Sequence, residues 1–164
     1  MYYFGLSMAS TLKMRLYRIT SPAYASDLQA TGCLYTNGRW HYKGTRVLYT
    51  SEHISLAKLE VLANSIVIPK NQVLVTIDIP KITSVKEISA IELPINWWEF
   101  PYPNYLAEIT ETWINEGLFW AMKVPSAQSA SEYNYLLNPL HAQHITAKII
   151  NIENIHFDKR LKQE

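Results

Sequence analysis

Apolar residues recur along the chain in short strand-like runs and in longer helical stretches. The strand-like runs occupy residues 15–20, 47–50, 72–79, 118–124, 133–137 and 145–150, with a weaker one at 85–88. Helices are expected at 21–29, at 51–64 and after residue 105 to about 115. Because helices and strands do not alternate regularly, the pattern predicts an α+β domain and disfavours a doubly wound parallel sheet.

The most informative of these helices is the segment 51–64. Ser51 suits its N-cap, and apolar residues surround the segment almost completely, which predicts a buried helix. Glu60 lies in the middle of it, between two apolar neighbours. A buried carboxylate is costly unless it is paired or hydrogen-bonded. Glu60 is therefore either a functional group or part of a narrow exposed stripe beside Asn64.

Length and composition indicate one domain. The chain has 164 residues, of which 48% are hydrophobic, enough for an ordinary core. Met14 comes directly before the first strand, so residues 1–13 are expected to be a dispensable extension and the domain to span 14–161. The charged end from Asp158 onward is expected to fray, with 162–164 outside the domain.

Charge and hydropathy restrict the possible partners. No run of about 18 apolar residues is present, and the N-terminus lacks the basic region of a signal peptide. Cys33 is the only cysteine, which excludes an internal disulfide. The formal net charge of +1 provides no basic patch. We therefore expect a cytoplasmic protein that contacts neither nucleic acid nor a membrane directly.

The common cofactor and metal motifs are missing. The sequence contains no G-x-G-x-x-G, no Walker loop, no C-x-x-C and no H-E-x-x-H. His141 and His144 are three residues apart, but they follow Asn138 and Pro139, which favour a turn. No carboxylate or cysteine nearby completes a ligand set. We expect no metal.

Several polar residues occupy positions that fit either a binding site or ordinary structure. Arg39 lies between Gly38 and Trp40, and it is either a fork for phosphate or a loop arginine in solvent or stacked on Trp40. Ser126 follows a predicted strand, where its hydroxyl either binds a ligand or caps a turn. Asn134 lies in the next strand and needs a partner if it points inward.

The aromatic segment 93–105 also has two interpretations. It includes Trp97 and Trp98 among several prolines and tyrosines. Tryptophan is well buried on average, which favours packing on the core. The alternative is an exposed patch for a partner.

Four blocks of sequence, in matching order and spacing, resemble the RES domain family, which is named for an arginine, a glutamate and a serine. The blocks are RLYR at 15–18; NGRW at 37–40 with KGT at 43–45 and VLYTS at 47–51; AKLEVL at 57–62; and VPSA at 124–127 with EYN at 132–134 and LNPLH at 137–141. The ending FDKRL at 157–161 also looks like that of the family, so the resemblance covers residues 14–161.

The chain departs from the family pattern in the second block. Asn37 stands where glycine is more common, and His41 and Tyr42 stand where asparagine and proline are more usual. Asparagine tolerates a left-handed backbone better than most residues, so the loop is expected to keep its shape.

The resemblance implies both a fold and an activity. The implied fold is like that of ADP-ribosyltransferases, with a core of mixed or antiparallel strands flanked by helices. The implied protein is a bacterial toxin whose partner is an Xre-like antitoxin that binds DNA and blocks the active site. Family members consume NAD by hydrolysis or phosphorolysis, and at least one ADP-ribosylates a protein. The implied substrate is NAD, and a homodimer is compatible with the sequence.

Residues that match the family take implied roles at the site. Glu60 would stabilise the oxocarbenium-like transition state that forms when nicotinamide leaves. Arg39 and Arg18 would clamp the pyrophosphate, and Tyr49 would pack on nicotinamide or ribose. Arg39, Tyr49 and Glu60 form the expected catalytic set. The two residues that would orient the ligand by hydrogen bonds are Ser126 and Asn134.

Two alternatives remain open beside an NAD-cleaving hydrolase or phosphorylase. One is a protein ADP-ribosyltransferase with NAD as donor, because nothing in the sequence chooses among water, phosphate and a protein side chain as acceptor. The other is a non-catalytic binding module that kept the fold. The intact Arg39, Tyr49, Glu60 and Ser126 argue against the module, because buried charges are costly to keep without use.

Overall fold

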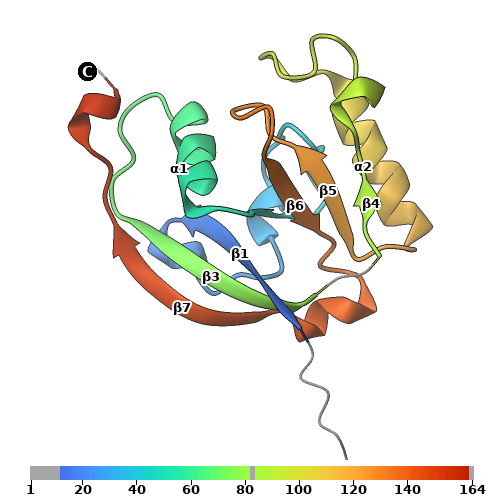
Figure 1. The fold of residues 1–164 in the computed structure, drawn as a ribbon, viewed down its shortest axis with the longest axis horizontal. Helices are drawn as coiled ribbons and strands as arrows, with labels where there is room; N and C mark the ends of the chain where they lie inside the picture. Colours follow the sequence, from blue (N-terminus) through green and yellow to red (C-terminus); the bar gives the residue numbers. More distant parts are fainter. Residues whose placement is uncertain (1–11, 82–83, 163–164) are drawn as a thin grey trace, which may run out of the picture.

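The backbone is organised around one seven-stranded sheet (Figure 1). The computed structural model describes residues 12–81 and 84–162. Its strands are β1 (Lys13–Thr20), β2 (Leu48–Ser51), β3 (Gln72–Pro80), β4 (Lys86–Glu87), β5 (Ala121–Pro125), β6 (Tyr133–Leu137) and β7 (Lys148–Ile155). They are ordered β4-β5-β6-β2-β1-β3-β7, and every neighbouring pair is antiparallel except β4 with β5.

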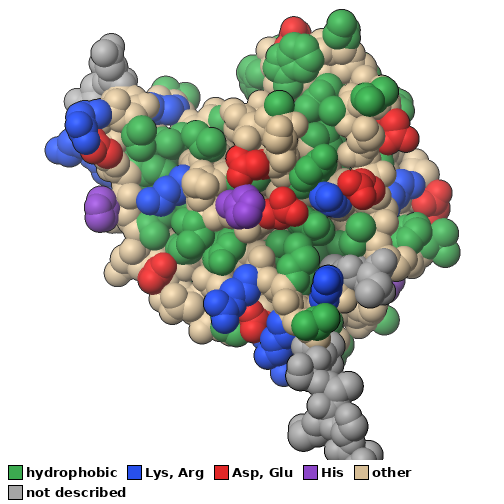
Figure 2. Space-filling view, in the orientation of Figure 1, with side chains coloured by type: hydrophobic (Ala, Val, Ile, Leu, Met, Phe, Trp, Pro, Cys, Tyr) green, Lys and Arg blue, Asp and Glu red, His purple; other side chains and the backbone are tan. Residues whose placement is uncertain are grey.

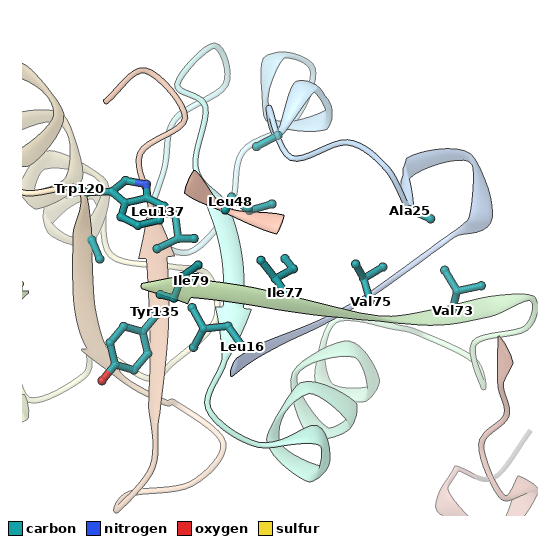
Figure 3. Close-up of a cluster of buried hydrophobic side chains, with 13 residues drawn as sticks. Leu16, Ala25, Leu48, Val73, Val75, Ile77, Ile79, Trp120, Tyr135 and Leu137 are labelled. Atoms are coloured by element: carbon teal, nitrogen blue, oxygen red, sulfur yellow. The ribbon is translucent and has the colours of Figure 1, made fainter. Parts of the chain in front are cut away.

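The longest ladder joins β1 to β3, from the pair Lys13 and Pro80 to the pair Thr20 and Val73. Alternate residues of a strand point to opposite faces of the sheet. One face of β3 therefore contributes to the main core cluster, and the other face packs Leu74 with Ile19 and Ala57. Figure 3 shows the main cluster, whose members include Leu16, Val75, Ile77, Ile79, Trp120 and Leu137.

Two helices cover different parts of the sheet. Helix α1 (Ile54–Ala63) contacts β1 and β2, whereas α2 (Asn104–Glu116) packs Leu106 and Trp113 into a second core cluster that includes residues of β5 and β6. Gly117 ends α2 with a left-handed φ of 63°, close to the helix end expected near residue 115. No helix in the described residues is long and apolar enough to span a membrane. The expected α+β class with a largely antiparallel sheet is confirmed.

The prediction of a helix at 21–29 is wrong. The structure has only a 3-10 turn at Pro22–Tyr24 and a second one at Thr31–Leu34. The carbonyl oxygens of Tyr24 and Asp27 accept hydrogen bonds from the Arg18 guanidinium. The Asp27 carboxylate accepts from the backbone N–H groups of Gln29 and Thr31. These contacts satisfy groups that a longer helix would have paired internally.

The character of α1 also differs from the expectation. Ser51 lies in β2 and does not cap the helix, whose N-cap position is occupied by His53. Only Leu56 and Ala57 are buried, while Ile54 and Leu59 are exposed to solvent. The helix is not buried on most sides because only one of its sides meets the sheet.

Other elements agree in type but not in extent. The strand expected at 118–124 begins at Ala121, and Leu118 is exposed. The strand expected at 145–150 runs over 148–155, because the residues before it form a 3-10 turn at Ala142–Thr146. In the aromatic segment, Trp97 is buried in the second core cluster and Trp98 is half exposed.

The first and last described elements are β1 and a 3-10 turn at Lys159–Leu161, and the predicted domain bounds of 14–161 stay a prediction. Strand β1 begins at Lys13, one residue before the predicted start, and residues 1–11 lie outside the described residues. The chain from Asp158 does not fray as expected, because Asp158 caps a 3-10 turn at Lys159–Leu161. Residues 163–164 also lie outside the described residues.

Candidate functional site

A cavity of about 570 Å³ lies where β1, β2 and β6 meet α1. Its wall also includes the loop of residues 37–40 and Tyr102 from the segment before α2. The surface is hollowed between the part of the molecule that carries α1 and the part that carries residues 93–103 (Figure 2). A volume of this size is typical of a site for a small organic ligand. Five of the six predicted site residues line this cavity: Arg18, Arg39, Tyr49, Glu60 and Asn134.

The Glu60 carboxylate is held by neutral donors. One oxygen, Oε1, accepts hydrogen bonds from Ser126 Oγ at 2.8 Å and from Asn134 Nδ2 at 2.5 Å. Ser51 Oγ donates to Asn134 Oδ1 at 2.7 Å, which fixes the orientation of that amide. The second oxygen, Oε2, has no hydrogen-bond partner among the described residues. Glu60 therefore presents a charged oxygen that a ligand can approach.

Ser126 has a different position from the one its predicted role suggests. Its side chain is buried and does not line the cavity. Its Oγ donates to Glu60 and also accepts from the backbone N–H of Gln128, so both interpretations of the hydroxyl describe part of its contacts. Ser126 therefore holds the Glu60 carboxylate from the protein interior and not from the cavity.

Arg39 is fixed between two segments of the chain. Its Nη1 donates to the carbonyl oxygens of Trp97 at 2.9 Å and Glu99 at 3.3 Å. Its guanidinium carbon lies 4.6 Å from the centre of the Tyr102 ring, within the range of a cation–π contact. The remaining N–H groups make no hydrogen bond to the described residues. Burial lowers the pKa of Arg39, and nearby Tyr102 and Glu60 oppose that shift.

Arg18 is held in a similar way. Its Nη1 donates to the carbonyl oxygens of Tyr24 at 3.2 Å and Asp27 at 2.9 Å. Burial lowers the pKa of Arg18, and the Asp27 carboxylate opposes this. Neither Arg18 nor Arg39 forms an ion pair with a carboxylate in the part of the chain that the structure describes. Two partly buried arginines that are not engaged in an ion pair can bind an anion with several oxygens.

Tyr49 extends from β2 toward the loop of residues 37–40, which carries Arg39 and is called the arginine loop below. Its hydroxyl accepts a hydrogen bond from Trp40 N at 3.2 Å and lies 2.7 Å from His41 Nδ1. Burial raises the pKa of Tyr49 far above its ordinary value, so the phenol stays protonated. The ring, rather than a phenolate, is what Tyr49 can present to a ligand.

The arginine loop keeps its shape in an unexpected way. Neither Asn37 nor Gly38 has a positive φ, so the left-handed backbone expected at Asn37 is not present. Instead, Asn37 Oδ1 accepts from Lys43 N at 2.7 Å and closes the loop. Gly38 is required by crowding, because a Cβ atom there would lie 2.4 Å from His41 Cε1.

His141 and His144, the spaced histidines of the sequence, do not converge on a common site. His141 caps the 3-10 turn by accepting from Gln143 N. His144 is buried, and its Nδ1 accepts from Trp120 Nε1 at 3.1 Å. Among the described residues, no group of three or more His, Cys, Asp or Glu side chains is placed to hold a metal ion.

The sequence reasoning missed three residues that shape the site. The sequence pattern indicates a helix cap at Ser51, although its place at the end of the VLYTS block also fits a role in the cavity. His41 departs from the family pattern, and nothing in its local sequence indicates a contact with Tyr49. No local pattern could have indicated Tyr102, because it reaches the site from a segment more than sixty residues beyond Arg39 in the sequence.

Comparison with protein families gives a match over almost the whole domain. The family model described as the RES domain matches residues 15–159. The chain is 30% identical over 155 residues to a protein named Toxin Res from Yersinia enterocolitica, covering 91% of this chain and 100% of the relative. It is 34% identical over 152 residues to a Toxin Res from Pseudomonas putida, covering 90% and 99% of the two chains.

Two further similarities concern function and fold. A protein named Prs ADP-ribosylating toxin, from a Sphingobium strain, is 28% identical over 141 residues, which cover 84% of this chain and 88% of the relative. Among solved structures, the M. tuberculosis MbcT–MbcA toxin–antitoxin complex contains a chain that matches with a TM-score of 0.68 and 14% identity. That match covers 92% of this chain and 87% of the other, and it shows a shared fold.

Proposed function

Because this chain belongs to the RES domain family, we propose that it is the toxin of a toxin–antitoxin pair and that it cleaves the bond between nicotinamide and ribose in NAD. One observation carries the proposal. A single cavity is lined by a carboxylate, Glu60, and two arginines, Arg18 and Arg39, none of which forms an ion pair within the described residues. A ligand with both a developing cation and an anionic group complements that arrangement, and NAD during cleavage is such a ligand.

The arginines account for the anionic half of the substrate. Arg18 and Arg39 each use Nη1 to bind backbone carbonyls, and their remaining N–H groups stay available. A guanidinium matches the spacing of phosphate oxygens with two parallel hydrogen bonds. In this proposal the pair binds the pyrophosphate and thereby fixes the distance of the ribose from α1.

Glu60 would act on the part of NAD that reacts, the bond between nicotinamide and ribose. Nicotinamide is positively charged in NAD and leaves as a neutral molecule, so its departure needs no general acid. The ribose carbon that loses it becomes oxocarbenium-like. The free oxygen of Glu60 stabilises this charge, and the hydrogen bonds to the other oxygen hold it in place before the reaction begins.

The other residues position the substrate. The ring of Tyr49 packs on nicotinamide or ribose. Asn134 lies at the cavity wall and, together with Ser126, fixes Glu60. Contacts of this kind contribute by orientation, which lowers the entropic cost of reaching the transition state.

Water or phosphate completes the reaction by bonding to the ribose carbon and losing a proton. Water gives ADP-ribose, and phosphate gives ADP-ribose 1″-phosphate. The test is to incubate the purified chain with NAD, with and without phosphate, and to measure nicotinamide. Release in both conditions supports hydrolysis, and release that requires phosphate supports phosphorolysis. No release in either condition from a folded chain free of antitoxin contradicts the proposal.

A protein side chain as acceptor is the second candidate. The Sphingobium relative named as an ADP-ribosylating toxin favours it, because most of both chains align. NAD labelled in its adenine moiety distinguishes the two functions. Label that stays on a protein after denaturing electrophoresis supports the transferase, whereas label found only in free ADP-ribose or its phosphate supports NAD depletion.

We further propose that an Xre-like antitoxin binds this chain over the cavity and blocks it, in the cytoplasm where NAD is available. The MbcT–MbcA complex gives a precedent for a toxin of this fold bound to an antitoxin. Co-expression with the protein from the adjacent gene, followed by co-purification, tests the pair. A homodimer remains a separate proposal, which analytical ultracentrifugation of the isolated chain tests.

A further inference from the structure

His41 is buried beside the loop of residues 37–40, and it contacts both this segment of the chain and strand β2. Its side chain is only 4% exposed. Its Nε2 lies 3.1 Å from the carbonyl oxygen of Thr36, and its Nδ1 lies 2.7 Å from the Tyr49 hydroxyl. Its backbone oxygen accepts from Gly38 N at 3.0 Å. Through Thr36, Gly38 and Tyr49, His41 therefore links the residues before Arg39 to strand β2.

These contacts determine where the protons lie. A carbonyl oxygen can only accept, so Nε2 must carry the hydrogen that bonds to Thr36. Burial lowers the pKa of His41, which favours the neutral ring, although the hydrogen bond to Thr36 opposes that shift. In the neutral ring Nδ1 has no hydrogen and accepts. The Tyr49 hydroxyl must then donate to His41 while it accepts from Trp40 N.

Two consequences follow for the cavity. The only hydrogen on the Tyr49 hydroxyl is directed to His41, so it is not available to a ligand. Arg39 lies between Gly38, which packs against the His41 ring, and Trp40, whose N–H binds the same hydroxyl. The backbone on both sides of Arg39 is therefore fixed through the bond between His41 and Tyr49.

We propose that His41 is a positioning residue, which holds the Tyr49 ring and the Arg39 loop in the geometry that binds the substrate. This inference rests on the proposed NAD-cleaving function. Asparagine places an acceptor oxygen where His41 has Nδ1, so either residue can accept the Tyr49 hydrogen bond.

Three substitutions separate the two side-chain bonds of His41. His41→Asn keeps an acceptor for Tyr49 and loses the bond to Thr36. His41→Gln places its polar atoms nearer to Nε2, so it keeps the reach to Thr36 and loses the acceptor for Tyr49. His41→Leu removes both bonds. His156→Asn is the matched control, because His156 is exposed directly after β7, does not line the cavity and makes no side-chain hydrogen bond among the described residues.

The first readout is the steady-state kinetics of nicotinamide release. We expect KM for NAD to rise about tenfold in His41→Gln and His41→Leu, the effect of losing one buried hydrogen bond. We expect His41→Asn to stay within about threefold of the wild type. A purely structural role would lower the fraction of folded enzyme, which reduces the apparent kcat and leaves KM unchanged. Equal KM values in the Asn and Leu variants would overturn the proposal.

The second readout does not depend on catalysis. A nitrogen–proton correlation spectrum of the imidazoles should show His41 as the neutral ring with its hydrogen on Nε2. Tyr49→Phe should shift the Nδ1 resonance of His41, because the hydroxyl that donates to it is removed. A hydrogen on Nδ1, or an unchanged resonance, contradicts the inference even if NAD is cleaved. If the wild type releases no nicotinamide, the proposed function fails and this spectrum alone decides the role of His41.

Discussion

Glu60→Gln changes the charge of the central side chain while it nearly preserves its shape. The glutamine oxygen can still accept the hydrogen bonds that Ser126 Oγ and Asn134 Nδ2 donate at 2.8 and 2.5 Å. The amide nitrogen then replaces Oε2, which has no protein partner to lose among the described residues. We therefore expect the free energy of unfolding to change by less than about 1 kcal/mol.

The expected loss of activity follows from the charge that is removed. Two opposite unit charges about 4 Å apart attract by about 4 kcal/mol at an effective dielectric constant of about 20, a value suited to a partly buried site. Glu60 is partly buried and lines the cavity. Since each 1.4 kcal/mol or so in the barrier changes the rate about tenfold, kcat should fall about a thousandfold.

The assay is nicotinamide release at saturating NAD, with thermal melting of each variant to verify folding. KM should change little, because the pyrophosphate still binds Arg18 and Arg39. Glu153→Gln is the matched control, because Glu153 is an exposed carboxylate on β7. A Glu60→Gln variant that turns over NAD at the wild-type rate would refute the electrostatic role of Glu60.

Three further predictions concern residues that support Glu60, the loop of residues 37–40 and the stability of the fold. Ser126→Ala should lower kcat about tenfold, because a hydrogen bond to a charged group contributes about 1.5 kcal/mol. A folded variant whose kcat equals that of the wild type would contradict this. Gly38→Ala should lower the free energy of unfolding by about 1–3 kcal/mol in urea denaturation, because its Cβ would lie 2.4 Å from His41 Cε1; an unchanged midpoint would contradict the crowding. Burial lowers the pKa values of His41 and His144, so the unfolded chain takes up protons first as the pH falls. Stability should therefore be complete above about pH 6.5 and decrease below it, and His144→Gln should reduce that decrease; identical urea curves at pH 7.5 and 5.5 would contradict it.

Local patterns predicted the strands better than the helices. Strand β3 was found because its alternating apolar residues meet the core on one face. The helix expected at 21–29 failed because Arg18, from a preceding strand, binds two carbonyl oxygens of that segment. Helix α1 was found, but its burial was not, because an apolar composition cannot tell which sides of a helix another element will cover.

The prediction of the candidate site depended on the family resemblance more than on local sequence patterns. Glu60 was unusual in its own helix, but Ser126 and Asn134 lie 66 and 74 residues away from it in the sequence. Nothing in their own neighbourhoods indicates that they share one carboxylate oxygen. The structure brings these residues together with Tyr49 and the two arginines around one cavity, while their roles in catalysis stay predictions.

A crystal structure of the Glu60→Gln variant with NAD tests the central claim most directly, because the slow variant should keep the substrate intact. The proposal predicts NAD in the cavity between α1 and β2, with its pyrophosphate against Arg18 and Arg39 and its nicotinamide–ribose bond facing residue 60. NAD bound elsewhere, or bound with that bond turned away from residue 60, would contradict the assignment of this cavity as the site of cleavage.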